Sequence, residues 1–152
     1  MSDHLVRTAW ARGGRAFRYE EYARDLQTFF EGGSKVDMSA AKAYRGDPKL
    51  PNPEDLLVAA LSSCHMLSFL AIACKRGFVV DAYEDRAVGT LAKDAEGRLA
   101  ITTCVLRPRV RFEGPIDRAQ LDALHEEAHH ACFIASSVKT HVTIEVPPDE
   151  AS

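Results

Sequence analysis

Two cysteines stand where they could do redox chemistry together. Cys64 lies in the middle of a long apolar segment, and Cys132 ends the apolar stripe of a second helical segment. If the two segments pack against each other, the thiols could come within disulfide reach, about 5.5–6 Å between Cα atoms. The alternative is that both are small buried apolar residues, the commonest fate of a free cysteine. The pattern alone leaves both interpretations open.

A reactive Cys64 would need a fixed cation close to its sulfur. Burial raises the pKa of a thiol, and a thiol in the middle of a helix gains little from the helix dipole. Arginine suits this role because it holds a thiolate and stays charged when it is partly buried. The candidates are Arg45, in the loop before the long segment, and Arg15, which follows two glycines. For either one the alternative is a solvated surface charge.

Two other kinds of site would use some of the same residues. His125 and His129 are four residues apart, a spacing that can bind zinc, and Cys132 follows three residues later. A polar helix face is the simpler interpretation, so we expect no metal there. Cys64 beside His65 could also suggest a cysteine hydrolase. Neighbouring residues on a helix point about 100° apart, so His65 cannot easily act as the base for Cys64.

The segment that contains Cys64 is predicted to form one long helix. Asn52 is a good N-cap, and Pro53 suits the first helical position. Gly77 is a left-handed stop after Arg76, which gives about 24 residues and roughly 36 Å. The segment is apolar on nearly all sides, so we expect it to be buried. A membrane span has a similar length, but the serines and the histidine inside the segment favour a core helix.

Short strands and a second helix are predicted around the long helix. Asp117 and Gln120 form a capping-box pattern at the start of the second helix. The fold class is therefore expected to be α+β, with antiparallel sheets packed on a long central buried helix plus a second helix. The expected strands, followed by a polar tail that Pro147 opens, are His4–Trp10, Phe17–Tyr19, Gln27–Glu31, Val80–Leu91, Leu99–Phe112 and Lys139–Val146.

The bulk composition fits one soluble domain over residues 1–152. The chain is 46% hydrophobic and 27% charged, with a net charge of −3. This balance does not favour nucleic acid or an anionic membrane as a partner, because both need a concentrated basic surface. The first residues show no apolar stretch behind a basic one, so we expect a cytoplasmic protein without a signal peptide. In a reducing compartment, a disulfide that forms is more often transient and catalytic than structural.

Two segments resemble the cysteine motifs of a known family. Residues 50–64 read LPNPEDLLVAALSSC, and residues 128–138 read AHHACFIASSV. They resemble the first and second cysteine motifs of the OsmC/Ohr family, the osmotically inducible and organic hydroperoxide resistance proteins. The Asn-Pro-Glu sequence with a cysteine ten residues after the glutamate is the more specific part. Chain length, cysteine separation and element order also match, so the resemblance covers essentially the whole chain.

The resemblance implies a cysteine-based peroxidase and assigns its site residues. Cys64 matches the peroxidatic cysteine and Cys132 the resolving cysteine. Glu54 matches the glutamate that holds the catalytic arginine. Arg45, nine residues before Glu54, is close to the arginine position of the OsmC branch. Arg15 looks more like the placement of the Ohr branch, and we prefer Arg45 because the helix motif beside it fixes its register.

The implied reaction passes through a Cys64 sulfenic acid and a Cys64–Cys132 disulfide, which an outside dithiol reduces. The resemblance points to an organic hydroperoxide as substrate and to a lipoyl-type dithiol as reductant. No metal, flavin or haem is expected, because sulfur carries the redox change. An apolar pocket lined by Leu61, Leu67 and Phe69 is a hypothesis for the preference for organic peroxides.

A dimer is also implied, because the family is known for intertwined dimers with active sites at the subunit interface. Glu54 and Cys64 are ten residues apart, or roughly 15 Å along a helix, so direct contact within one subunit is not expected. Phe133 replaces a frequent proline, and His65 replaces a frequent aromatic residue, which indicates a divergent branch. The alternative function is a dimeric, non-enzymatic redox-sensing or ligand-binding module of the same fold.

Overall fold

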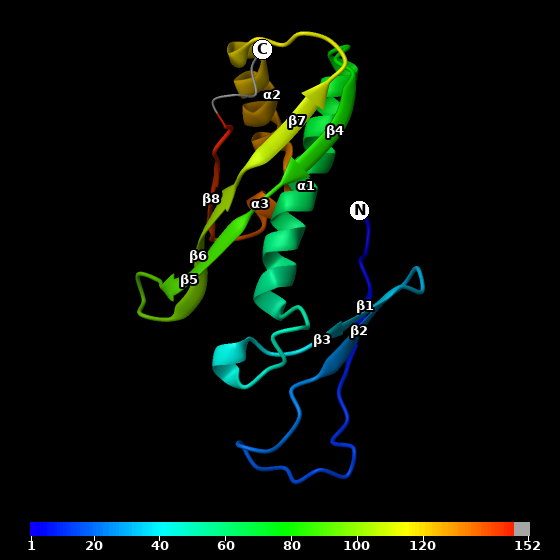
Figure 1. Cartoon of the computed structure of the whole chain (residues 1–152), viewed down its shortest axis with the longest axis vertical. Helices are drawn as coiled ribbons and strands as arrows, with labels where there is room; N and C mark the ends of the chain where they lie inside the picture. Colours follow the sequence, from blue (N-terminus) through cyan, green and yellow to red (C-terminus); the bar gives the residue numbers. More distant parts are fainter. Residues whose placement is uncertain (148–152) are drawn as a thin grey trace. The chain divides into compact units, whose positions relative to one another are not determined.

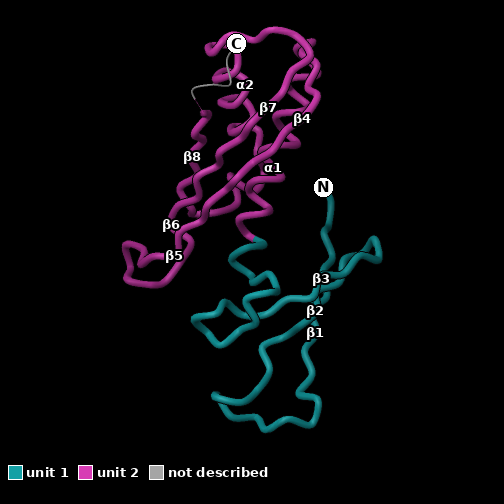
Figure 2. Tube along the Cα trace, viewed as in Figure 1, with its two compact units in different colours: residues 1–56 teal, residues 57–152 magenta. Residues whose placement is uncertain are grey.

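The chain folds into two compact units, which Figure 2 shows in different colours. The computed structural model describes residues 1–147. The first unit comprises residues 1–56 and the second begins at Leu57. The polar tail predicted after Pro147 lies outside the described residues. The single domain expected from length and composition stays a prediction.

The first unit is built on a three-stranded antiparallel sheet in the order β1-β2-β3. The strands are β1 (Val6–Ala9), β2 (Leu26–Phe30) and β3 (Lys35–Met38). Strand β1 lies inside the predicted range His4–Trp10, and β2 is shifted by one residue from the predicted range Gln27–Glu31. Strand β3 was not predicted. It pairs with β2 across a tight turn in which Gly33 adopts a left-handed φ of 86°. Only glycine adopts this conformation without steric cost, which explains the tight turn.

The prediction of a strand at Phe17–Tyr19 is wrong. The Phe17 ring packs 5.3 Å from the Tyr22 ring, centre to centre. Arg24 is buried and donates hydrogen bonds to the backbone carbonyls of Tyr19 and Tyr22. These contacts turn the backbone and occupy carbonyls that a strand would offer to a neighbouring strand, so the segment is irregular.

The long helix α1 (Pro53–Lys75) confirms the predicted bounds. At its start, the Asn52 and Asp55 side chains each accept a hydrogen bond from the other's backbone N–H, at 2.9 and 3.0 Å. This reciprocal pair satisfies two of the free donors at the helix end. Gly77 ends the helix with a left-handed φ of 82°, as predicted.

Burial of α1 is one-sided within the chain. Its buried residues are Leu61, His65, Phe69 and Ala73, which repeat every four positions and therefore share one face. A stripe on another face stays exposed, formed by Ala59, Ser63, Leu67 and Ala71. Burial on most sides was expected, but the second helix and one ribbon of strands cover a single face. The helix is long and apolar enough to cross a membrane by composition alone, with a mean hydropathy of 2.0.

The second unit continues as one long, bent antiparallel ribbon, visible beside α1 in Figure 1. Its strands are β4 (Val80–Asp85), β5 (Val88–Lys93), β6 (Leu99–Leu106) and β7 (Pro108–Phe112); β4 pairs with β7, and β5 with β6. The single strand predicted over Leu99–Phe112 is broken at Arg107. Its N–H donates to the Asp85 side chain at 2.6 Å instead of to a neighbouring strand.

The last elements complete a mixed arrangement. Helix α2 (Arg118–Ala131) begins with the predicted capping box of Asp117 and Gln120. A short helix α3 (Phe133–Ser136), which was not predicted, follows directly. Strand β8 (His141–Ile144) pairs with β6 in parallel, although only antiparallel pairing was expected. The α+β fold class is confirmed.

Two apolar clusters hold the second unit together. In the first, Phe69 and Ala73 of α1 pack with Leu121, Leu124 and Ala128 of α2. In the second, Leu61 packs with residues of β6 and β8, namely Cys104, Leu106 and Val142. The two clusters meet α1 on the same face but at different heights.

Candidate functional site

A polar layer separates the two apolar clusters along α1. On the buried face of this helix, His65 stands between Leu61 of one cluster and Phe69 of the other. Cys64 precedes it. The second helix runs in the opposite direction, so that His125 meets Phe69 and His65, while Cys132 meets Cys64. Two imidazoles and two thiols therefore gather where the rest of the helix interface is apolar.

The two thiols face each other, as the sequence led us to expect. The Cys132 side chain lies close enough to that of Cys64 to raise its pKa, and both are free thiols. Burial raises the pKa of the Cys132 thiol; the backbone N–H of Ala135, 3.5 Å from Sγ, opposes the rise, and the neighbouring Cys64 adds to it. Cys132 is 1% exposed, whereas Cys64 is partly accessible. A reagent can therefore reach Cys64 more readily than Cys132.

The histidine pair was missed by the sequence reasoning. His65 Nε2 lies 3.0 Å from His125 Nδ1, and the two rings are nearly parallel. Burial lowers the pKa of His65 to about 4 and that of His125 to about 3, so both imidazoles are neutral at pH 7. The available signal was that each histidine falls on the apolar stripe of its helix, where a polar residue needs a buried partner.

The side chains of His125, His129 and Cys132 do not come together as the ligands of a metal ion. His125 Nδ1 faces His65 instead. Within residues 1–147, no group of three His, Cys, Asp or Glu side chains is placed to hold a metal ion.

The remaining predicted residues belong to the first unit. Arg45 is exposed, and its guanidinium carbon lies 5.7 Å from the centre of the Tyr19 ring. No ion pair joins it to Glu54 among the described residues. Arg15 is also exposed, and its carbonyl accepts a hydrogen bond from Arg12. The structure therefore does not bring Glu54 together with either candidate arginine.

The backbone at Arg45 is unusual. Arg45 follows the short 3₁₀ turn of residues 42–44 and has a φ of 66°. Within residues 1–147 it is the only non-glycine residue with a positive φ. The next residue, Gly46, packs so closely that an added Cβ would lie 1.5 Å from the Ala40 carbonyl oxygen. A non-glycine residue in this left-handed conformation costs roughly 1–2 kcal/mol. An observed outlier of this kind supports a functional role for the side chain.

Glu54 faces an apolar cavity of the first unit. The cavity has a volume of about 600 Å³, and its walls include Trp10, Phe17, Tyr22 and the buried Arg24. The Glu54 Oε2 atom is buried and accepts no hydrogen bond from any described residue. A buried carboxylate oxygen without a partner costs free energy, so it favours a cation or a donor beside it. Arg24, which sequence reasoning did not single out, lines the same cavity.

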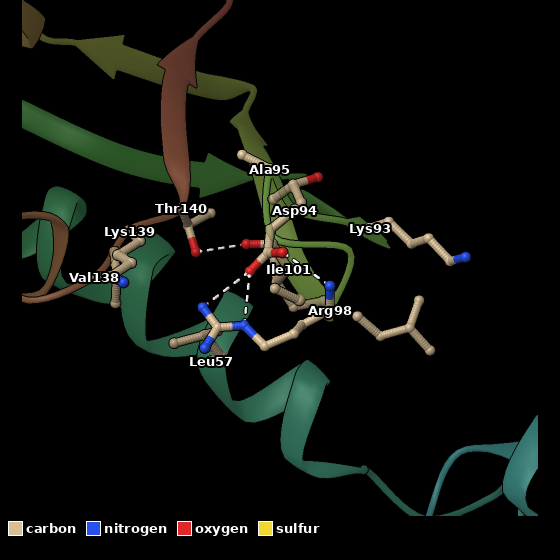
Figure 3. Close-up of a pocket in the computed structure, with 12 residues that line it drawn as sticks. Leu57, Lys93, Asp94, Ala95, Arg98, Ile101, Val138, Lys139 and Thr140 are labelled. Carbon is tan, nitrogen blue, oxygen red and sulfur yellow. Dashed lines mark hydrogen bonds and ion pairs between the residues drawn. The ribbon is translucent and has the colours of Figure 1, made fainter.

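A second cavity, of about 730 Å³, lies in the second unit and is drawn in Figure 3. Asp94 at its rim is paired with Arg98 at 3.2 Å, and the Arg98 backbone N–H lowers the pKa of this carboxyl. The Thr140 hydroxyl donates to the Ile101 carbonyl at 2.7 Å. Asp94 is thus paired with Arg98, and the Thr140 hydroxyl with the Ile101 carbonyl, so these groups give no sign of a ligand site.

The pocket predicted from Leu61, Leu67 and Phe69 is wrong. Leu61 and Phe69 are fully buried in the two apolar clusters, and Leu67 lies on the exposed stripe of α1. Burial of the first two on the face toward α2 and the ribbon leaves no space between the three side chains.

Comparison with known proteins identifies the family. A family model described as OsmC-like protein matches residues 46–147, about two thirds of the chain. The chain belongs to the OsmC-like family. No curated protein matches this OsmC-like chain in sequence.

Solved structures resemble this OsmC-like chain over nearly its whole length. An OsmC-like protein of unknown function from Vibrio cholerae is 42% identical, with a TM-score of 0.92, covering 97% of this chain and all of that one. An organic hydroperoxide resistance protein from Legionella pneumophila has 16% identity and a TM-score of 0.67, covering 96% of each chain. The organic hydroperoxide resistance protein OhrB of Bacillus subtilis has 18% identity and a TM-score of 0.66, covering 96% of this chain and 98% of its own. The last two show the shared fold.

Proposed function

We propose that this protein is a thiol-dependent peroxidase that reduces organic hydroperoxides to alcohols. The observation that carries the proposal is the contact between the Cys64 and Cys132 thiols inside the interface of α1 and α2. Two free thiols in contact, one partly accessible and one buried, suit a cysteine that meets peroxide and a cysteine that resolves the product. Two names among the structural relatives, organic hydroperoxide resistance proteins, agree with this reaction.

The proposed cycle assigns one step to each thiol. The Cys64 thiolate attacks a peroxide oxygen, the O–O bond breaks, and the alcohol leaves with a proton. Cys64 is then a sulfenic acid. The Cys132 sulfur attacks this sulfenic sulfur, the S–O bond breaks, and the thiol proton leaves with the hydroxide as water. An outside dithiol, which we propose to be of lipoyl type, reduces the disulfide by exchange in the reducing environment of the cytoplasm.

We assign the supporting charges to Arg45 and Glu54. Arg45 would hold the Cys64 thiolate, and Glu54 would orient the guanidinium. The unpaired, buried Oε2 of Glu54 and the left-handed backbone of Arg45 support these roles. The apolar cavity that Glu54 faces is the candidate site for the organic group of the peroxide.

We also propose that the protein is a homodimer that covers the exposed stripe of α1. The stripe consists of small or apolar residues, with Leu67 at its centre and 64% exposed. A large leucine on such a stripe favours a protein partner over water. We expect Leu67→Glu to shift the dimer toward monomer in sedimentation, whereas Glu126→Lys on the exposed face of α2 does not. A monomeric wild-type protein would contradict this part of the proposal.

The decisive experiment follows the consumption of cumene hydroperoxide with dihydrolipoamide or dithiothreitol as reductant. We expect wild-type protein to turn over repeatedly, Cys64→Ser to be inert, and Cys132→Ser to stall after one oxidation. Cys74→Ser is the matched control, because Cys74 is an exposed cysteine on the same helix. If wild-type and Cys64→Ser proteins are equally inert, the peroxidase proposal is wrong. A single oxidation with no turnover would instead favour a redox-sensing module.

A further inference from the structure

On one side of a polar layer, α1 packs against α2 through apolar residues, and on the other side Leu61 of α1 packs against β6 and β8. Phe69 of α1 packs against His125 on one side of the layer, with ring centres 4.4 Å apart. Inside the layer, His65 and His125 are 1% and 3% exposed, and a hydrogen bond of 3.0 Å joins them. Cys64 and Cys132 make the other polar contact across the same two helices.

Apolar packing alone specifies the register of two helices weakly. Leucine and alanine side chains tolerate rearrangements that conserve volume, and packed helices can shift past each other by one turn, about 5.4 Å. A buried hydrogen bond between side chains resists such a shift, because each atom left unpaired costs about 1–3 kcal/mol. Single buried polar residues fix the register of coiled coils for this reason.

The surroundings of the pair keep it uncharged. The groups whose charge acts on the pair are His129 on α2, Asp85 at the end of β4, and Arg118 at the start of α2. A charge on His129 or Arg118 opposes protonation of the pair, while the Asp85 carboxylate favours it. Burial is the largest influence and lowers the pKa of both imidazoles. At pH 7 the bond therefore joins two neutral rings, one nitrogen donating and the other accepting.

A disulfide requires a fixed distance between the helices. The Cα atoms of a disulfide lie about 4.4–6.8 Å apart, so a shift of one turn would separate Cys64 from Cys132. His65 is the residue next to Cys64, and His125 lies seven residues, or two turns, before Cys132. The hydrogen bond joins α1 to α2, and the thiol contact joins α1 to the residue that caps the end of α2, so both depend on how the two helices are aligned.

We propose that the His65–His125 hydrogen bond is a positioning device for the resolving step of the cycle. It keeps α1 and α2 in the register that presents the Cys132 sulfur to the oxidised Cys64 sulfur. In that step an S–S bond forms, the S–O bond of the sulfenic acid breaks, and the Cys132 proton leaves in water. The pair touches neither peroxide nor the reacting oxygen, so it affects disulfide formation and not the first attack. This role rests on the proposed function of the two thiols.

The test compares variants of matched size. His125→Leu removes the bond and leaves His65 Nε2 unpaired, whereas the double variant His65→Leu/His125→Leu removes both polar groups. His125→Asn restores a short side chain that can hydrogen-bond at the position of Nδ1. His130→Leu is the control, because His130 is exposed on the same helix. Urea unfolding of each protein identifies the variants that remain folded.

Two steps are measured in single turnover with one equivalent of cumene hydroperoxide. The sulfenic acid is trapped with dimedone, and the disulfide is followed by loss of the free Cys132 thiol. We expect the folded double variant to form the sulfenic acid within about twofold of the wild-type rate and the disulfide at least tenfold more slowly, with His125→Asn close to wild type. Equal disulfide rates in the wild type and the double variant, or equal slowing of both steps, would overturn the proposal.

A measurement without peroxide separates this inference from the peroxidase proposal. In glutathione buffers, the equilibrium between the dithiol and the Cys64–Cys132 disulfide reports only the approach of the two sulfurs. We expect the equilibrium constant for forming the disulfide to be tenfold lower in the double variant. This corresponds to a shift of about 30 mV in reduction potential. If wild-type protein ignores peroxide but shows this dependence, the peroxidase proposal fails and the positioning role stands. An unchanged potential contradicts the positioning role.

Discussion

Two of the buried places where polar atoms lack a hydrogen-bond partner among the described residues differ in kind. In the first unit, the buried Oε2 atom of Glu54 accepts no hydrogen bond, and Glu54 is one of the residues that line an apolar cavity. In the second unit, His65 Nδ1 and His125 Nε2 lack partners, but the other nitrogens of these rings are bonded to each other. The first place holds an acidic side chain, whereas the second holds two imidazoles that are neutral at pH 7.

The difference shows what each place needs from its surroundings. A buried carboxylate is costly until a cation or a donor reaches it, so the Glu54 cavity is suited to receiving a group. A neutral imidazole pair is half satisfied and costs less, so the layer between α1 and α2 is suited to holding two helices in place. Variants at Glu54 should accordingly change peroxide turnover, and variants of the histidine pair should change the free energy of unfolding.

The largest effect is expected for Glu54→Gln, which keeps the size of the side chain and removes its charge. If Glu54 orients the catalytic guanidinium, peroxide turnover should fall by about 10²–10³ in kcat/KM, as for loss of one preorganised group in other active sites. Steady-state kinetics with cumene hydroperoxide measure this. Glu31→Gln, at an exposed site, should leave kcat/KM unchanged. An unchanged Glu54→Gln enzyme would remove Glu54 from the site.

Acid should lower the free energy of unfolding through the His65–His125 pair. The pKa values of His65 and His125 in the folded protein, about 4 and about 3, lie below the unfolded value of 6.5. As pH falls from 6.5 toward 4, the two imidazoles bind protons in the unfolded chain but stay neutral in the folded protein. The free energy of unfolding therefore falls. The slope is about 1.4 kcal/mol per pH unit for each imidazole.

Urea titrations at pH 7, 6 and 5 measure that slope. The variant with leucine at both positions should lose it, because it has no imidazole to protonate there. His141→Leu, which removes an exposed histidine, should keep it. A wild-type protein that is equally stable at pH 7 and pH 5 would show that the pair is accessible to protons in the folded state.

A smaller effect is expected for Arg45→Gly. The left-handed backbone at φ 66° suits glycine, so the free energy of unfolding should rise by about 1 kcal/mol. Thermal unfolding measures this, with Arg15→Gly as the comparison because only the preceding glycines have positive φ there. If the more stable Arg45→Gly protein also loses peroxide turnover, the side chain is retained for chemistry. Destabilisation would mean that the guanidinium contact with Tyr19 outweighs the backbone cost.

The smallest effect is expected for Cys74→Ser. Cys74 is exposed near the end of α1 and belongs to neither place. The free energy of unfolding should change by less than about 0.5 kcal/mol, and turnover should not change. Loss of activity in this variant would point to a third redox-active thiol.

Local patterns were enough to predict the long helix and the second helix. Asn52 and Gly77 mark the ends of α1 because capping and left-handed stops depend on a few adjacent residues. The positions of Cys64 and Cys132 on apolar stripes allowed the two thiols to meet, and the resemblance to the OsmC/Ohr family assigned them as a pair.

Contacts between distant residues decided what the patterns missed. The strand predicted through Arg107 is broken because the Asp85 side chain, 22 residues away in the chain, accepts a hydrogen bond from its N–H. The roles predicted for Arg45 and Glu54 stay predictions, since the structure shows no contact between them within residues 1–147.

The sequence by itself determined the α+β class and the membership of the OsmC-like family, and it named Cys64 and Cys132 as candidates for a thiol pair. Only the tertiary structure paired His65 with His125 and left the buried Glu54 Oε2 atom without a hydrogen bond from any described residue. The physical reason is range. Caps and periodic stripes act between residues within a few positions, whereas the partner of a buried polar group is set by the packing of elements that are 60 residues apart in the chain.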